Sequence, residues 1–220
     1  MSPKVGMAPI RRRQIIDATR RCLLRKGFYR VTIQDIAREA GVSTGIPHHY
    51  FGSREEILMA TLYDTANRVR DWVADEMARG ASARQCLELM IRAQSPEHAQ
   101  VRDLWLIWMD YWSEAGRDER LASFQSERTT WWIEQFQQLI QRGIDEGDFL
   151  PGETLDRARR FWAFLDGLSI HCTVGDASIP ASDFVRLALD YVRRDLYRPE
   201  IAASVPARPR QYRNGKSVDV

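Results

Sequence analysis

The chain has 220 residues, of which 44% are hydrophobic, and its 32 Lys and Arg nearly balance 30 Asp and Glu. This length and composition indicate one large or two small globular domains with a buried core. No apolar run approaches the roughly 20 residues of a membrane span, and no signal peptide is evident, so we expect a cytoplasmic protein with no membrane partner.

A first helix is predicted for residues 9–26. Apolar residues share one face there, cations crowd the last turn, and Gly27 follows as a left-handed stop. The three cysteines, Cys22, Cys86 and Cys172, lie far apart, and each falls within an apolar helical pattern. They are therefore expected to be reduced core thiols rather than disulfide partners.

The most informative stretch of the chain is residues 32–51, TIQDIAREAGVSTGIPHHYF. Its first apolar residues recur at i, i+3, i+4 and i+7, and Thr32 with Asp35 matches a capping box, so a short helix begins directly after Thr32. Gly41 then stands where a helix-turn-helix needs a left-handed backbone, and Ser43 is a suitable cap for a second helix. In such a unit the second helix lies in the major groove of DNA.

The charge around this motif suits a nucleic acid. Residues 1–51 carry ten Lys and Arg against three Asp and Glu, a net charge of +7, which leaves the remainder of the chain at −5. A solvated helix face is the ordinary explanation of a basic run. Here the run coincides with the motif, which favours phosphate binding.

Pro47 is unusual in a recognition helix. With Ser43 as the N-cap, Pro47 is the fourth helical residue, where it forfeits the hydrogen bond to the Ser43 carbonyl and its ring crowds that carbonyl. We therefore expect an opened or 3₁₀-like first turn, and we expect Pro47→Ile to raise the stability of the protein.

The apolar patterns in the rest of the chain indicate further helices and no convincing strand, so we expect an all-α fold. The expected helices cover residues 53–79, 82–93, 96–114, 118–146, 155–173 and 181–196. The expected domains are a three-helix DNA-binding domain with the helix-turn-helix over residues 1–52 and a helical effector-binding and dimerisation domain over residues 53–200. Residues 201–220 lack apolar periodicity and are expected to be a disordered tail.

The first 60 or so residues resemble the N-terminal domain of TetR family transcriptional regulators. The matching residues are Thr32, Ile36, Ala37, Ala40, Gly41, Val42, Ser43, Gly45, Tyr50, Phe51, Arg54 and Glu55. Within that family, residues 1–16 and the segment STGIPHHYFG are most similar to BetI-type repressors, which control the conversion of choline to glycine betaine. The remaining three-quarters of the chain resembles the family in helix number and length only.

The resemblance implies roles for individual residues. Thr44, Gly45 and His48 would face base edges, and Thr32, His49, Tyr50 and Arg54 would hold phosphates, while Lys4 and the three arginines after Ile10 would form a basic arm. The expected DNA-binding residues are Arg11, Arg12, Arg13, Thr32, Ser43, Thr44, Gly45, His48, His49, Tyr50 and Arg54. No metal site is expected, because the adjacent histidines lack partners at zinc spacing.

The C-terminal two-thirds is rich in tryptophan, and two interpretations remain open. Aromatic helix faces paired with carboxylates suit a cationic ligand through cation–π attraction, whereas an aromatic stripe at helical spacing is also typical of a helical core. The expected effector-binding residues are Trp105, Trp108, Trp112, Glu127, Trp131, Glu134 and Trp162.

The last two predicted helices each carry an apolar stripe. The family resemblance implies that they form a dimer interface, packed with their mates as a four-helix bundle, and an intramolecular core is the alternative from the sequence alone. The expected interface residues are Leu165, Leu168, Phe184, Leu187, Ala188 and Tyr191.

Together these patterns predict a homodimeric, ligand-responsive transcriptional repressor on a pseudo-palindromic duplex operator, released by a cationic small molecule such as choline or betaine aldehyde. The alternatives are an activator, or a regulator with an apolar effector or none. No G-x-S-x-G, P-loop, Rossmann or HExxH motif is present, so we expect neither an enzyme nor a cofactor. The basic segment beside the motif argues against a helical protein adaptor.

Overall fold

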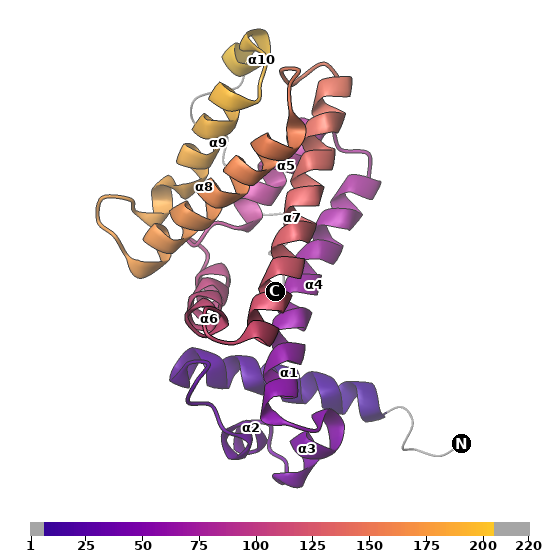
Figure 1. Ribbon diagram of the computed structural model, residues 1–220, viewed down its shortest axis with the longest axis vertical. Helices are drawn as coiled ribbons and strands as arrows, with labels where there is room; N and C mark the ends of the chain where they lie inside the picture. Colours follow the sequence, from indigo (N-terminus) through magenta and orange to yellow (C-terminus); the bar gives the residue numbers. More distant parts are fainter. Residues whose placement is uncertain (1–6, 205–220) are drawn as a thin grey trace. The chain divides into compact units, whose positions relative to one another are not determined.

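The computed structural model describes residues 7–204, apart from the side chains of residues 7, 66, 68–70, 72, 73, 76, 77 and 204. Its helices are α1 (Met7–Lys26), α2 (Ile33–Glu39), α3 (Gly45–Phe51), α4 (Arg54–Ala78), α5 (Ala83–Ala93), α6 (Ala99–Ala115), α7 (Glu119–Asp145), α8 (Thr154–Val174), the 3₁₀ turn η1 (Ala181–Asp183), α9 (Phe184–Asp195) and α10 (Pro199–Ser204) (Figure 1). The all-α prediction is confirmed for the part described. None of these helices is long and apolar enough to cross a membrane.

Two predicted boundaries were wrong. The sixth helix begins at Ala99 rather than Pro96, because residues 96–98 form a turn in which the His98 N–H bonds to the Ser95 carbonyl at 3.2 Å. The expected disordered tail began too early, since Ile201 and the next three residues belong to α10. The remainder of that tail lies outside the described residues.

The chain divides into two compact units. Unit 1 contains residues up to Val69 together with Leu106–Ser113 of α6, and unit 2 contains the remaining residues. The division differs from the expected boundary after residue 52, because the first half of α4 and the middle of α6 pack with the N-terminal helices. In α6, for example, the ring of Tyr111 lies edge-on to that of Phe28 with centroids 5.8 Å apart.

In unit 1, α2 and α3 lie side by side next to α1 (Figure 1). The core consists of apolar side chains that are almost completely buried. They include Ile15, Leu23, Val31, Ile36, Ile57, Leu58 and Leu62. This packing holds α2 against α1 and α3 against α2.

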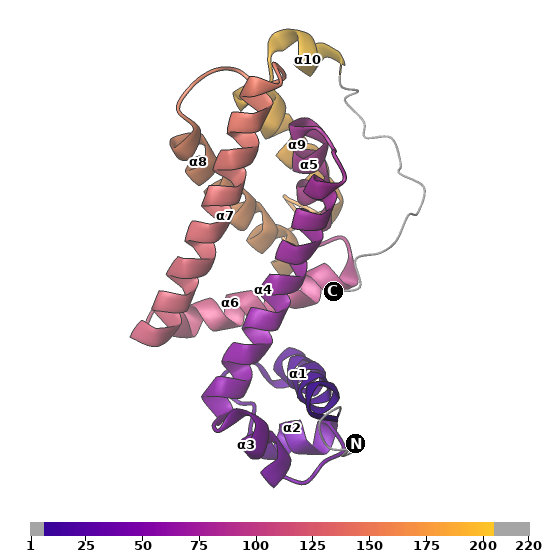
Figure 2. The ribbon, with the colours of Figure 1, turned by 90° about the vertical axis from the view of Figure 1, so that its right-hand side faces the viewer.

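In unit 2, α7 and α8 pack along each other, and α5 packs against both α7 and α9 (Figure 2). The fully buried side chains between them are largely aromatic, including Phe136, Phe149, Phe161 and Phe184. An isolated β-bridge joins Phe149 to Tyr197 and closes the end of this bundle.

Candidate DNA interface and effector region

The helix-turn-helix begins with the predicted capping box. The Thr32 hydroxyl accepts a hydrogen bond from the Asp35 N–H at 3.2 Å, and the Asp35 carboxylate accepts one from the Thr32 N–H at 3.1 Å. At the other end of α2, Gly41 adopts a φ of 66° and the Val42 N–H bonds back to the Ala37 carbonyl at 2.9 Å. The chain therefore turns sharply between α2 and α3, as the glycine predicted.

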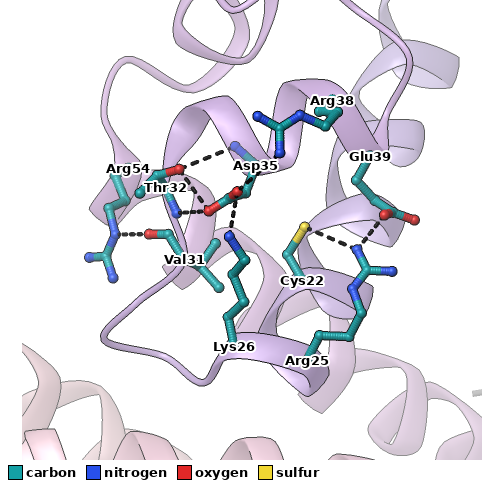
Figure 3. A network of polar contacts seen from close by, with 9 residues as sticks. All are labelled: Cys22, Arg25, Lys26, Val31, Thr32, Asp35, Arg38, Glu39 and Arg54. Carbon is teal, nitrogen blue, oxygen red and sulfur yellow. Dashed lines mark hydrogen bonds and ion pairs between the residues drawn. The ribbon is translucent and has the colours of Figure 1, made fainter.

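Ion pairs hold α2 against the C-terminal turns of α1 (Figure 3). Lys26 Nζ lies 2.6 Å from Asp35 Oδ1, and Glu39 pairs with both Arg21 and Arg25. The Lys26 ammonium, followed by the Thr32 hydroxyl, lowers the pKa of Asp35 to about 2. Several of the segment's basic residues thus serve internal contacts, which reduces the number available for phosphates.

The start of α3 differs from the prediction. The N-cap is Thr44 rather than Ser43, and its side chain makes no capping hydrogen bond. The Ile46 N–H bonds to the Ser43 carbonyl at 3.0 Å, which forms a 3₁₀-type turn before the helix. The first turn is thus 3₁₀-like, as expected from Pro47.

The expected strain at Pro47 is absent. Because α3 begins at Gly45, Pro47 is its third residue, and an N–H at that position has no intrahelical acceptor. The Ser43 carbonyl that Pro47 was expected to leave unpaired already accepts from Ile46. The proline ring is buried and therefore contributes packing at no cost in backbone hydrogen bonds.

One face of α3 is exposed and the other is buried. Pro47 and Phe51 lie in the core, and Tyr50 is half-buried. The exposed residues at the start of α3 and along it are Ser43, Thr44, Gly45, His48 and His49. A Cβ atom built at Gly45 would meet nothing within 4 Å, so the backbone is open to solvent at that position. These are the predicted DNA-facing residues, presented together on one surface.

Two of the predicted phosphate contacts instead point into the protein. The Arg54 guanidinium donates to the Val31 carbonyl (Figure 3). It also donates to the carbonyls of Phe28 and Tyr29, so it ties the loop before α2 to the start of α4. The Arg12 guanidinium donates to the Tyr50 carbonyl at 2.8 Å. These arginines are structural supports of the helix-turn-helix.

The expected basic arm is not an arm where the structure describes it. Arg11, Arg12 and Arg13 lie within α1, with Arg11 bonded to Gln14 at 2.9 Å and Arg13 paired with Asp64 at 2.9 Å. Lys4 lies outside the described residues. An arm would need an extended segment at Arg11 to Arg13, but α1 already begins at Met7, so these arginines are helical.

Asp110 on α6 makes a long-range contact that the sequence did not predict. Its carboxylate accepts a hydrogen bond from the Phe28 N–H, at the left-handed turn where Gly27 has a φ of 78°. It lines a hollow of about 410 Å³ together with Leu23, Gly27 and Leu106. A long-range contact of this kind leaves no signal in local sequence spacing.

In unit 2, aromatic residues of α7 and α8 form a continuous cluster. Trp132 stacks on Trp162 with centroids 5.5 Å apart and an interplanar angle of 12°, and Trp131 lies edge-on to Trp132 at 4.8 Å. The ring centroids of Phe136 and Trp162 lie 6.0 Å apart. Trp131 and Trp162 were predicted for the effector region, whereas Trp132, the buried partner of both, was not.

The carboxylate beside this cluster is not one that the sequence predicted. Glu127 and Glu134 are exposed, while Asp166, one turn after Trp162, is half-buried with its Oδ1 atom shielded from solvent. Burial raises the pKa of Asp166 to about 6, against the opposing influence of the Arg128 charge. The signal available in the sequence was an acidic residue within the apolar stripe of residues 165–172.

The three tryptophans of α6 are divided between the two compact units. Trp105 belongs to unit 2, where its indole N–H bonds to the Gln94 carbonyl at 3.4 Å. Trp108 and Trp112 belong to unit 1, and Trp108 lies edge-on to Tyr111 with centroids 5.7 Å apart. Trp108 is 7% exposed, so packing explains its presence.

Most of the predicted dimer residues are buried within the single chain. Leu165, Leu168, Phe184 and Ala188 have between 0% and 6% of their surface exposed. The burial of these four side chains within one chain favours the alternative interpretation, an intramolecular core. Leu187 and Tyr191 are half-buried, and the Tyr191 ring stacks on Phe164 with centroids 4.6 Å apart.

A capped helix, a glycine turn and an exposed second helix define a helix-turn-helix DNA-binding protein. Residues 15–61 match the family model of bacterial regulatory proteins of the tetR family, and residues 83–196 match the C-terminal model of BetI-type transcriptional repressors. The chain belongs to the TetR family, in its BetI-type branch of transcriptional regulators, which is not a class of enzymes.

Relatives and solved structures agree with this assignment. The chain is 31% identical to the HTH-type transcriptional regulator BetI of Rhizobium meliloti over 88% of this chain and 93% of that protein, and 30% identical to BetI of Klebsiella pneumoniae over 90% and 100%. A putative transcriptional regulator from Saccharomonospora viridis, solved in complex with choline, is 26% identical with a TM-score of 0.78, covering 85% of this chain and 97% of that one. A TetR regulator from Haloarcula marismortui shares the fold, with 23% identity, a TM-score of 0.76 and coverage of 86% and 99%.

Proposed function

We propose that this regulator is a homodimeric repressor that reads a pseudo-palindromic operator with α3. The observation that carries the proposal is the single exposed face formed by Thr44, Gly45, His48 and His49, beside which the chain is strongly basic. Short polar side chains and an open glycine backbone allow a helix to approach base edges closely. Such a protein acts in the cytoplasm, where the chromosome is.

The DNA contacts divide into two groups. Thr44, Gly45 and His48 would read bases, and Thr32, Ser43, His49 and Tyr50 would position the helix on phosphates. We leave Arg12 and Arg54 out of this set, because their guanidinium groups are engaged with backbone carbonyls. Arg38, whose side chain is 80% exposed on α2, replaces them as a candidate phosphate contact.

The test is fluorescence anisotropy with a labelled duplex taken from upstream of the regulator's own coding sequence. We expect two chains per duplex, affinity that falls steeply with salt, and a loss of about 1 to 3 kcal/mol of sequence discrimination in His48→Ala. Arg120→Ala is the matched control, because Arg120 is 81% exposed in the first turn of α7. Equal affinity for scrambled duplexes would refute operator recognition.

For the dimer we propose an interface on the outer faces of α8 and α9. Leu187, Tyr191 and Phe164 are partly exposed there, and their apolar surface is available to a second copy. Light scattering checks the stoichiometry, and Leu187→Glu should produce monomers that bind half-sites weakly. A monomeric wild-type protein would overturn this part of the proposal.

We further propose that a cationic small molecule releases the operator. The solved relative with choline and the cluster of indoles in unit 2 support a quaternary ammonium ligand. Choline should quench tryptophan fluorescence and weaken operator binding over the same concentration range, since linkage couples the two equilibria. Release by apolar compounds alone would favour an apolar effector instead, and tighter operator binding with choline would indicate a co-repressor.

A further inference from the structure

Three polar side chains form a row on one face of α8. Asp166, Ser169 and Thr173 stand at i, i+3 and i+7, so they project from the same side of the helix. Ser169 and Thr173 are 0% and 1% exposed, and Asp166 is half-buried. Trp162 shares this face, because it precedes Asp166 by four residues. We call the three residues the polar row, which continues the aromatic cluster toward the C-terminal end of α8.

Each residue of the polar row has a buried side-chain oxygen without a hydrogen bond. Among residues 7–204, no partner reaches Asp166 Oδ1, Ser169 Oγ or Thr173 Oγ1. A buried polar atom without a partner costs free energy, so such an atom in a folded protein indicates a water molecule or a ligand group that binds it. Three of them on one helix face indicate a polar site rather than an isolated packing defect.

The other buried threonines of the described helices behave differently. Thr19, Thr61 and Thr65 donate to the carbonyl four residues earlier, at 2.8, 2.9 and 2.9 Å. This local bond is open to a serine or threonine within a helix. Ser169 and Thr173 do not make it, although both are as deeply buried. Their hydroxyl groups therefore remain available to a group outside their own helix.

The charge around Asp166 favours a neutral partner for its free oxygen. Arg128 on α7 acts on the carboxylate and opposes the rise in pKa that burial causes. A second cation at Asp166 would stand near an existing one, which is unfavourable in a partly buried place. A hydroxyl group adds no charge, and it both donates and accepts hydrogen bonds.

Helix geometry sets which members of the polar row one hydroxyl group can reach. Asp166 and Ser169 are about 4.5 Å apart along the helix axis, so a single oxygen atom between them can bond to both. Thr173 lies about 10.5 Å from Asp166 along the axis, which is too far for the same atom. Asp166 and Ser169 together supply the acceptor and the donor that one hydroxyl group needs.

We propose that Asp166 and Ser169 bind a hydroxyl group of the effector. The effector hydroxyl donates to Asp166 Oδ1 and accepts from the Ser169 hydroxyl, so both buried oxygens gain a partner. This inference rests on the proposed function and narrows its ligand from ammonium ions in general to ammonium alcohols, whose cationic end is left to the indoles of unit 2. A site that hydrogen-bonds a hydroxyl rejects an analogue without it, because the protein groups are then left unpaired.

The experiment is calorimetric titration of the full-length protein with choline and with ethyltrimethylammonium, in which hydrogen replaces the hydroxyl of choline. The wild type should bind choline about tenfold more tightly or better. Ser169→Ala and Asp166→Leu should each reduce this preference to about twofold or less, because one partner of the hydroxyl is lost. Thr173→Val is the matched control, since it removes an equally buried, unpartnered hydroxyl from the same face, and it should keep the wild-type preference.

Circular dichroism reports whether each variant is folded, and Ser169→Ala, which removes a single oxygen atom, is expected to fold. If the wild type binds neither ammonium compound, the proposed cationic effector fails and this subsite fails with it. If the wild type binds both compounds equally, the hydroxyl subsite is refuted while the proposed function stands. The same holds if folded Ser169→Ala or Asp166→Leu keeps the preference for choline, or if Thr173→Val loses it.

Discussion

Replacement of Arg54 by lysine separates a structural role from a phosphate contact. The Arg54 fork donates to three carbonyls, those of Phe28, Tyr29 and Val31, and its side chain is 25% exposed. A lysine keeps the charge but can satisfy only one or two of these acceptors from its flexible stem. Hydrogen bonds to charged groups contribute about 1.5 to 3 kcal/mol each. Water can replace the bond to the carbonyl of the exposed Tyr29. We therefore expect Arg54→Lys to lower the free energy of unfolding by about 2 to 3 kcal/mol.

The assay is urea unfolding followed by circular dichroism, combined with operator binding at several salt concentrations. Arg38→Lys is the control, since Arg38 is 80% exposed and should change the unfolding free energy by less than about 0.5 kcal/mol. Each phosphate contact contributes about 0.9 to the slope of log affinity against log salt. Arg54→Lys should leave that slope unchanged, because the wild-type guanidinium is not directed at DNA.

The reasoning is refuted if Arg54→Lys has wild-type stability. It is also refuted if Arg54→Gln lowers the salt slope as Arg38→Gln does, because Arg54 would then contact phosphate in the complex. In that case binding of DNA would have to free the guanidinium from the Phe28 and Val31 carbonyls.

Three further predictions test local features. Because burial raises the pKa of Asp166 to about 6 from an ordinary 3.8, its ionisation disfavours the folded state, a penalty absent at low pH and complete above about pH 6. Asp166→Asn should therefore unfold with a free energy higher by up to about 3 kcal/mol at pH 8 and unchanged near pH 3, and equal denaturation midpoints at both pH values would contradict this. Pro47→Ile should give a melting temperature at or below that of the wild type, since the Ser43 carbonyl is already bonded; a clear rise would restore the strain hypothesis. Gly27→Ala should cost about 2 kcal/mol or more, because φ is 78° and the new Cβ would lie 2.7 Å from Asp110 Oδ2, and calorimetric melting with no loss would exclude this contact.

Local sequence patterns predicted the elements that depend on neighbouring residues. The Thr32 and Asp35 pair predicted the start of α2, and Gly41 predicted the turn after it, because both act within four residues of backbone. The N-cap of α3 was misplaced by one residue. Ser43 and Thr44 are both capable caps, and the choice depends on the Ile46 hydrogen bond and on burial of the Pro47 ring.

The direction of long side chains was not predictable in the same way. Arg12 and Arg54 look like DNA contacts in a basic segment, yet tertiary structure brings backbone carbonyls within their reach. Likewise, helical periodicity identified Leu165 and Leu168 as apolar but could not say whether α7 of the same chain or a second copy would cover them. Asp166 was missed because its surroundings come from α7, far away in the sequence.

The absence of a side chain at Gly45 is not required by the fold of the chain. Its backbone is not left-handed, and a methyl group there would meet nothing within 4 Å among residues 7–204. An alanine should be tolerated by the isolated fold and even favour the helix. If α3 approaches base edges as proposed, the only molecule that can exclude a side chain at position 45 is the DNA itself, so the constraint on this residue lies outside the polypeptide.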